Sequence, residues 1–425
     1  MNNNKPNLMG SYGAWLESYV ERKPILSMLG EERSGVSRPG ESGTNRGLPN
    51  GNQPNIEGWK EKAQNKFKEL IGYLTLEKNI RAKVVGKTQY DGLIIEEIIW
   101  QMPFGPETHA YFLRPEKYSG TLPGILALHD HGGFKYFGKE KITQTDREVH
   151  PSLRRHWDVY YSGRAWANEI AKRGFGVLVP DVFTFGSRRI NPVNLPEAAL
   201  NKYLNDFELF QRLKKEEKKD AAADSFATSL NDVSQEQIDD YNEFAKHYEH
   251  VIAKSLFSAG TTWPALFIAD DQIALSYLCS RPEINESCIG CCGLSGGGLR
   301  TNYLSGIDDR IKCSVTAGFM STWRDFALNM SYAHTWMLYV PHLINYLDFP
   351  EILGMRVPLP SMVLSTYSDP LYTSEETERA DKMLSEIYER ADALDRLKIS
   401  WHQGPHYFNE AMQEEAFSWL ERWLK

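Results

Sequence analysis

The stretch Glu286–Gly298, ESCIGCCGLSGGG, changes from a short apolar run to a glycine-rich turn within a few residues. The run Cys288–Cys292 is typical of a buried strand, and Gly293–Gly297 fits the pattern G-x-S-x-G. The pattern has a mechanism when a strand, a sharp turn with serine at its apex and a helix follow one another, because the strained serine is then exposed at the strand end. Small residues are needed two positions before and two positions after Ser295, and both positions hold glycine.

Length and composition are typical of a globular protein with one large or two modest domains. The chain has 425 residues, of which 41% are hydrophobic and 24% charged, with a net charge of −8. No basic block is long enough to follow a phosphate backbone, which argues against a nucleic-acid partner. The N-terminus lacks the pattern of a signal peptide, and no apolar run approaches the roughly 20 residues of a membrane span. Five cysteines, three of them in or beside one buried strand, indicate thiols in a reducing compartment. We therefore expect a cytoplasmic protein without a membrane partner.

Buried apolar runs alternate with helical patterns through most of the chain. Pro123–His129 and Gly174–Asp181 are continuous apolar runs, which favour a parallel sheet covered on both faces. Earlier, Asp91-Gly92 separates two runs rich in β-branched residues and predicts a hairpin. Further strands are expected at Ile311–Thr316, Pro360–Ser365 and Leu397–Trp401. The alternation predicts an α/β fold with a mostly parallel central sheet flanked by helices.

Two segments depart from this alternation. Residues 1–56 are expected to form an N-terminal helical arm over 8–29 and a flexible linker over 31–55, before a main domain over 57–425. Residues 183–260 are too many for a simple loop and predict a helical insertion, with helices over 204–218 and 235–256. The insertion is either a solvated excursion or a lid, because it leaves from a sheet edge where ligand sites lie. The arm packs either on the main domain or on a second subunit, and we hypothesise that it contacts a second subunit in a homo-oligomer.

Three chemically active residues follow predicted strands at comparable positions. Ser295, Asp369 and His406 each come just after the carboxyl end of a strand, the edge where catalytic groups gather in such sheets. A serine hydroxyl needs a base within hydrogen-bond reach, and His406 would take its proton. Asp369 would hold the imidazole tautomer and stabilise its charged form. His402 is a rival base, but it lies almost on the strand, whereas the loop gives His406 the freedom to reach the serine.

The negative oxygen of a tetrahedral intermediate needs hydrogen-bond donors. We expect the backbone N–H groups of Gly296 and Gly133 to form this oxyanion hole, Gly133 lying in the loop His131-Gly132-Gly133 after a buried strand. The competing interpretation is a metal site at His129 and His131, which share one face of an extended chain. No matching cluster stands out elsewhere, so we expect neither a metal nor a cofactor. An ion pair between Asp181 and Arg188 is expected to hold the shape of the site.

Several motifs carry a resemblance to a known family. The chain resembles the α/β-hydrolase superfamily, in its acetyl xylan esterase and dienelactone-hydrolase-like branch, which includes the bacterial abhydrolase 7 family. The resemblance covers most of residues 80–425, and the matching motifs are HDHGG at His129–Gly133, GKEK at Gly138–Lys141, VPDVFTFGSR at Val179–Arg188, DDQIALSYLCSRPEI at Asp270–Ile284, GLSGGG at Gly293–Gly298, YSDPLY at Tyr367–Tyr372 and GPH at Gly404–His406. It implies an α/β-hydrolase fold and the hydrolysis of carboxylic esters, often of short acyl groups on sugars.

The substrate-binding residues are less defined than the triad. His131 and Trp263 are candidates, and Trp323 and Trp336 could also offer a platform for a sugar ring, although packing in the aromatic core is the commoner role of such residues. The residues and the resemblance together predict a serine carboxylesterase that works through an acyl-enzyme on a small-molecule ester such as an acetylated carbohydrate. Cleavage of lactones, amides or peptides on the same triad remains an alternative, as does an inactive binding protein that retains the fold.

Overall fold

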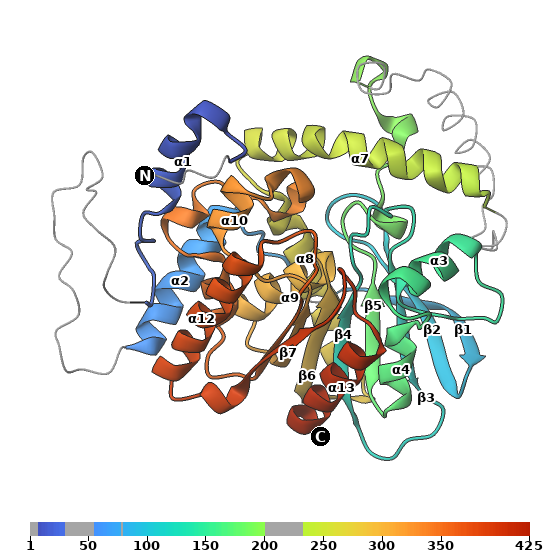
Figure 1. Ribbon diagram of the computed structural model, residues 1–425. Helices are drawn as coiled ribbons and strands as arrows, with labels where there is room; N and C mark the ends of the chain where they lie inside the picture. Colours follow the sequence, from blue (N-terminus) through green and yellow to red (C-terminus); the bar gives the residue numbers. More distant parts are fainter. Residues whose placement is uncertain (1–6, 30–54, 78–79, 200–232) are drawn as a thin grey trace.

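The computed structural model describes residues 7–29, 55–77, 80–199 and 233–425. Its centre is one sheet of nine strands in the order β1-β2-β3-β5-β4-β6-β7-β8-β9 (Figure 1). The first three strands pair antiparallel, β3 pairs antiparallel with β5, and all later neighbours are parallel. The strands are β1 Lys83–Tyr90, β2 Leu93–Trp100, β3 Thr108–Pro115, β4 Leu122–Leu128, β5 Gly176–Pro180, β6 Ile284–Leu294, β7 Ile311–Ala317, β8 Ser361–Thr366 and β9 Leu397–His402.

Helices cover both faces of the sheet, as the continuous apolar strands predict (Figure 1). The longer described helices are α1 Gly13–Val20, α2 Ile56–Ile71, α3 Pro151–Tyr160, α4 Trp166–Lys172, α7 Gln235–Ser258, α8 Trp263–Ser280, α9 Gly296–Ile307, α12 Ser374–Arg390 and α13 Glu410–Leu424, with the short α10 Trp323–Leu328 and α11 Phe349–Gly354. One core joins α4 and α13 to the sheet, and another joins α2, α8, α9 and α12 on the opposite face. The predicted α/β class and mostly parallel sheet are confirmed.

Most predicted elements lie where the sequence places them, and two regions differ. The hairpin at Asp91-Gly92 joins β1 to β2, and both residues have positive φ. The expected helix over 8–29 is reduced to α1 and a preceding short turn, because the chain after α1 is irregular and its Ile25 and Leu26 N–H groups bond to the carbonyls of Asn345 and Tyr346. Helix α3 lies in a stretch for which no helix or strand is predicted from the sequence. The predicted linker over 31–55, apart from its last residue, and the helix over 204–218 lie outside the described residues.

The described part of the N-terminal arm packs on its own chain. The Leu8 N–H donates to the Leu328 carbonyl at 3.1 Å. Met28 N–H donates to the buried Glu351 carboxylate at 2.8 Å. On α1, Glu17 pairs with Arg324 at 2.8 Å. The arm therefore covers α10 and α11 of the same molecule.

A helix that spans a bilayer must be both long and apolar. None of the described helices alone meets both requirements, and only α7 and α8, taken together across a bend of 90°, do so by length and composition.

Candidate active site

The turn between β6 and α9 has the geometry that its glycines predict. Ser295 has a positive φ of 56°, rare for a residue with a side chain, and its N–H donates to the Ala317 carbonyl at 2.9 Å. A Cβ on Gly293 would lie 2.5 Å from the Gly297 carbonyl carbon, and one on Gly297 would lie 2.1 Å from the Leu128 oxygen. The predicted strand, serine turn and helix are thus confirmed, and Ser295 lies at the amino end of α9, where backbone N–H groups lack helical partners.

Asp369 and His406 meet across two neighbouring loops. Asp369 follows β8, His406 follows β9, and Asp369 Oδ2 lies 2.6 Å from His406 Nδ1. The other carboxylate oxygen accepts the Leu371 N–H at 2.9 Å. Both side chains are largely buried, with exposed fractions of 7% and 11%. The pairing fixes Nδ1 as the protonated nitrogen, so Nε2 is left as the nitrogen that can accept a proton.

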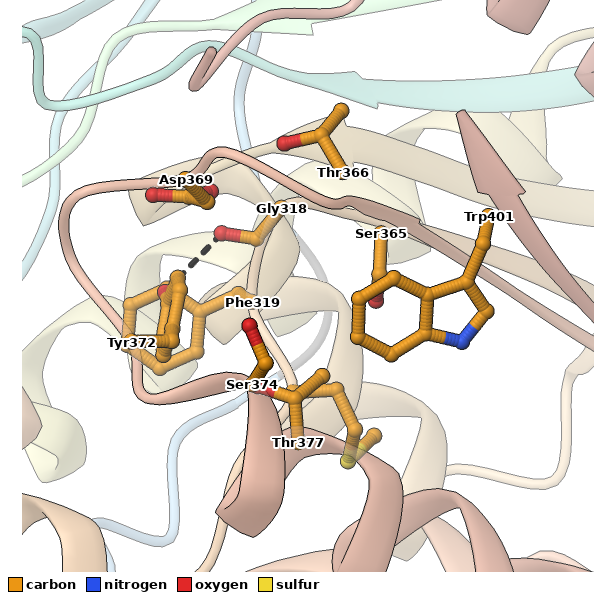
Figure 2. A pocket seen from close by; sticks show the side chains of 10 residues that line it. Gly318, Phe319, Ser365, Thr366, Asp369, Tyr372, Ser374, Thr377 and Trp401 are labelled. Atoms are coloured by element: carbon orange, nitrogen blue, oxygen red, sulfur yellow. Dashed lines mark hydrogen bonds between the residues drawn. The ribbon is translucent and has the colours of Figure 1, made fainter. Parts of the chain in front are cut away.

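The Asp369 side chain lies beside a small cavity lined by residues of the neighbouring strands and loops. Figure 2 shows Asp369 on the same side as Gly318 and Tyr372, with Trp401 on the opposite side of a cavity of about 10 Å³, the size of one water molecule. The Tyr372 hydroxyl donates to the Gly318 carbonyl at 2.9 Å, which ties the Asp369 loop to the end of β7 (Figure 2). The Asp369 carboxylate itself is held by its bonds to His406 Nδ1 and to the Leu371 N–H.

Ser295 and His406 line one cavity of about 450 Å³. Its apolar wall comes from Leu294, Phe319, Ala333 and Leu371, and its polar wall from Asp130, His131, Lys135, Asn242, Lys246 and Glu249. His406 Nε2 has no hydrogen-bond partner among the described residues, and the serine hydroxyl is not bonded to it. A volume of this size is typical of a small-molecule site.

The loop after β4 brings a different amide to the serine than the sequence predicts. The Gly133 N–H donates to His131 Nδ1 at 3.0 Å, within its own loop. A Cβ on Gly296 would lie 2.8 Å from His131 N, so the His131 backbone amide is the one beside the serine turn. The expectation for Gly133 is therefore revised in favour of His131, while Gly296 keeps its place directly after Ser295.

Helix α7, in the predicted insertion, contributes one side chain that joins both walls of the cavity. Glu249 Oε1 lies 2.7 Å from His131 Nε2 and 2.7 Å from Lys135 Nζ. Its other oxygen accepts from Thr335 Oγ1 at 2.8 Å and from the Trp336 N–H at 3.2 Å. Burial raises the pKa of Glu249, but the charges of Lys135 and His131 outweigh it and hold that pKa below its ordinary value. The carboxylate is therefore ionised and fixes the His131 ring.

Two sequence predictions are corrected here. Trp263 is 1% exposed, packs against Phe183 with ring centroids 5.5 Å apart, and does not line the cavity. Asp181 does not pair with Arg188: it lies 3.1 Å from Lys139 Nζ, whereas Arg188 lies 3.1 Å from Asp270. Lys139 and Asp270 are the actual partners. In the sequence, neither residue can be told apart from a charged residue exposed to solvent.

The tryptophan platforms predicted for a sugar ring separate into two kinds. Trp323 is 6% exposed and belongs to the core, whereas Trp336 is 39% exposed and lines the cavity. His334, which belongs to none of the sequence motifs, also lines the cavity, and its Nε2 lies 2.8 Å from the Leu371 carbonyl oxygen. Burial lowers the pKa of His334 to about 4, so it is neutral at physiological pH.

The residues of the alternative metal site have other partners. His129 Nδ1 lies 3.0 Å from the Asp130 carbonyl, and His131 Nε2 faces Glu249. Within residues 7–29, 55–77, 80–199 and 233–425, no group of three or more His, Cys, Asp or Glu side chains is arranged to hold a metal ion.

Comparison with known proteins supports the fold. No family model matches the chain. A Bacillus subtilis (strain 168) protein, provisionally named hydrolase YtaP, is 22% identical over 356 residues, which cover 84% of this chain and 96% of that protein. A provisionally named acetyl xylan esterase from Bacteroides fragilis NCTC 9343 matches with a TM-score of 0.61 and 13% identity, over 95% of this chain and 84% of that chain.

A glucuronoyl esterase from Solibacter usitatus matches with a TM-score of 0.55 and 11% identity, over 86% of this chain and 92% of that chain. At these identities the similarity concerns the fold. The sheet order, the serine turn between β6 and α9 and these similarities together show that the chain has the α/β-hydrolase fold.

Proposed function

We propose that the protein is a serine hydrolase that cleaves carboxylic esters through an acyl-enzyme, with short acyl esters of carbohydrates or other small molecules as substrates. The observation that carries the proposal is that Ser295 and His406 line one cavity, while Asp369, behind His406, is bonded to His406 Nδ1 at 2.6 Å. The similarity to proteins named as esterases supports an ester as the substrate.

The first half-reaction forms the acyl-enzyme. His406 Nε2 takes the proton of the Ser295 hydroxyl as the serine oxygen attacks the ester carbonyl carbon. Asp369 stabilises the imidazolium that results. The carbonyl oxygen becomes an oxyanion, which the N–H groups of Gly296 and His131 stabilise by hydrogen bonds. His406 then gives its proton to the leaving alkoxide, and the alcohol departs.

The second half-reaction releases the acid. Water enters, His406 takes one of its protons, and the hydroxide attacks the acyl carbon through a second tetrahedral intermediate. Collapse of this intermediate returns the proton to Ser295 and frees the carboxylic acid. The apolar residues Leu294, Phe319 and Leu371 offer a dry surface to the acyl chain, and Trp336 and Lys246 offer a ring face and a hydrogen-bond donor to a hydroxylated alcohol.

A substrate panel tests this proposal. Rates should be compared for p-nitrophenyl acetate, butyrate and octanoate, a p-nitroanilide, a simple lactone and acetylated xylose, with the native protein and Ser295→Ala. We expect the acetate to be the best aryl ester, acetate release from the acetylated sugar, and loss of all activity in the variant. Activity confined to the anilide would contradict ester hydrolysis, and activity that chelation abolishes would favour a metal-dependent route through His129 and His131.

The proposal includes a cytoplasmic location. All five cysteines, Cys279, Cys288, Cys291, Cys292 and Cys313, are free thiols, which supports a reducing compartment.

A further inference from the structure

Buried cations lie against three successive carbonyl groups of the loop after β4. The His129 carbonyl accepts from Arg300 Nη1 at 3.4 Å. The Asp130 carbonyl accepts from the Lys141 ammonium and from His129 Nδ1, the latter at 3.0 Å. The His131 carbonyl accepts from Lys141 Nζ at 3.2 Å. Each of these three carbonyl oxygens therefore accepts from a buried cation.

One of these peptide groups has a chemical consequence for the site. The Asp130 carbonyl and the His131 N–H belong to the same planar trans peptide, in which the C=O and N–H bonds point in opposite directions. A cation at the carbonyl oxygen thus fixes the N–H on the far side, where His131 N lies next to Gly296. It also draws electron density from the peptide, which makes the N–H a stronger donor.

Lys141 is held where it can act on this peptide. Its side chain is fully buried, lies 3.6 Å from the Asp130 carboxylate, and its ammonium lies 4.7 Å from the centre of the Phe185 ring. The Asp130 carboxylate is itself bonded by His156 Nε2 at 3.1 Å and by the Tyr161 hydroxyl at 2.5 Å. In such a water-excluded setting, a charge acts on a neighbouring dipole far more strongly than in water.

We propose that Lys141 is a positioning residue of the oxyanion hole, which orients and polarises the Asp130–His131 peptide so that the His131 N–H stabilises the tetrahedral intermediate. The inference rests on the proposed ester hydrolysis. Lys141 does not touch the substrate, and its effect reaches the reacting atoms through one peptide group.

A charge that acts in this way makes the reaction sensitive to alkaline pH. The charged and titratable groups facing Lys141 are Asp130, Arg300, Asp181, His129 and His131. Burial lowers the pKa of Lys141 to about 8, against the opposing effect of Asp130. The ammonium would therefore lose its proton in the range where many esterases are assayed, and kcat should fall above pH 8. A guanidinium at this position stays charged throughout that range.

The test compares kcat and KM for p-nitrophenyl acetate from pH 6 to pH 10 in the native protein, Lys141→Met, Lys141→Arg and Lys139→Met, with thermal unfolding of each. Lys139 is a matched control, because it is an equally buried lysine that pairs with Asp181 and does not contact the loop carbonyls. We expect Lys141→Met to lower kcat about tenfold to a hundredfold at neutral pH, with KM changed little and no alkaline decline. Lys141→Arg should retain more activity and lose the decline above pH 8, and Lys139→Met should keep it.

Native kcat in folded Lys141→Met would overturn the inference. If that variant does not fold, the native profile decides: a kcat that stays level to pH 10 overturns it, and a decline that Lys141→Arg removes supports it. These results are distinguishable from a failure of the proposed function. A native protein without Ser295-dependent ester hydrolysis contradicts both, whereas Ser295-dependent activity that is indifferent to residue 141 contradicts this inference alone.

Discussion

Asp369 Oδ2 lies 2.6 Å from His406 Nδ1, and the same carboxylate accepts the Leu371 N–H at 2.9 Å through its other oxygen. Each oxygen of the Asp369 carboxylate thus has a hydrogen-bond partner. The bond to Nδ1 holds the His406 imidazole with its Nε2 available to the serine. Asp369→Asn retains the shape but presents an amide that favours the opposite tautomer. We expect kcat for p-nitrophenyl acetate to fall about 10⁴-fold, with Tm changed little. A loss below tenfold in the folded variant would mean that another group orients His406.

Gly297 is a position where any side chain meets backbone. A Cβ there would lie 2.1 Å from the Leu128 oxygen at the end of β4, which cannot move without moving the adjoining oxyanion loop. Gly297→Ala should therefore reduce stability by about 1–3 kcal/mol or more and abolish ester hydrolysis.

Gly86→Ala is the control for this substitution. Gly86 lies on β1 at the sheet edge, and the nearest atom to its Cβ is the Glu97 Oε2 at 3.3 Å, the end of a flexible side chain. Chemical denaturation should show a change within about 0.5 kcal/mol for this variant. Equal effects of the two substitutions would contradict the close approach at the serine turn.

Glu249 neutralises a buried cation while it joins the two walls of the cavity. Glu249→Gln removes the counter-charge of Lys135, so we expect a loss of about 3–5 kcal/mol in stability and a higher KM, because His131 and Trp336 lose their common partner. The matched control is Glu243→Gln on the same helix, where the carboxylate pairs with His247 and both side chains are about half exposed, at 52% and 53%. An unchanged Tm and KM in Glu249→Gln would show that the Glu249 charge has no part in shaping the site.

The buried carboxyl group of Asp381 should make the stability of the protein depend on pH. Its carboxylate accepts from Trp401 Nε1 at 2.8 Å, and burial raises its pKa to about 7, with the Trp401 bond acting against this. Because the folded pKa exceeds the ordinary value of about 3.9, the unfolded chain loses this proton first. The contribution of Asp381 to stability is thus full below about pH 4, declines as the pH rises, and is lost above about pH 7.

Asp381→Asn cannot ionise, so its Tm relative to the native protein should rise between pH 4 and pH 8, by a few degrees for about 1–2 kcal/mol. Because the variant and the native protein are compared at the same pH, the effects of the other buried carboxyl groups on Tm cancel. Asp395→Asn, at an exposed position, should show no such trend. A Tm difference for Asp381→Asn that is the same at both pH values would contradict the raised pKa.

The parts of the fold that could be predicted are those fixed by local rules. Gly293 and Gly297 reveal the turn around Ser295 because no other residue fits there. The buried strands are visible as apolar runs, and their carboxyl ends bring Ser295, Asp369 and His406 to one edge of the sheet.

The parts that could not be predicted depend on contacts between distant segments. Glu249 lies more than a hundred residues after His131 on a helix whose composition is that of a solvated surface, so nothing local indicates their pairing. Lys139 and Lys141 alternate with Glu140 and give the pattern of exposed charge, yet all three are buried. Trp263 and Trp336 are equivalent in sequence terms, and only burial separates the core residue from the one at the cavity.

The central claim, that Ser295 is an activated nucleophile, is tested most directly by labelling with a fluorophosphonate probe and mass spectrometry of the modified peptide. The native protein should give one adduct, on Ser295, and folded Ser295→Ala should give none. Asp369→Asn should label far more slowly, because the probe reacts with Ser295 only when His406 takes the serine proton, and Asp369 orients His406 for this step. No adduct on the folded native protein, or an adduct on another serine that persists in Ser295→Ala, would contradict the account.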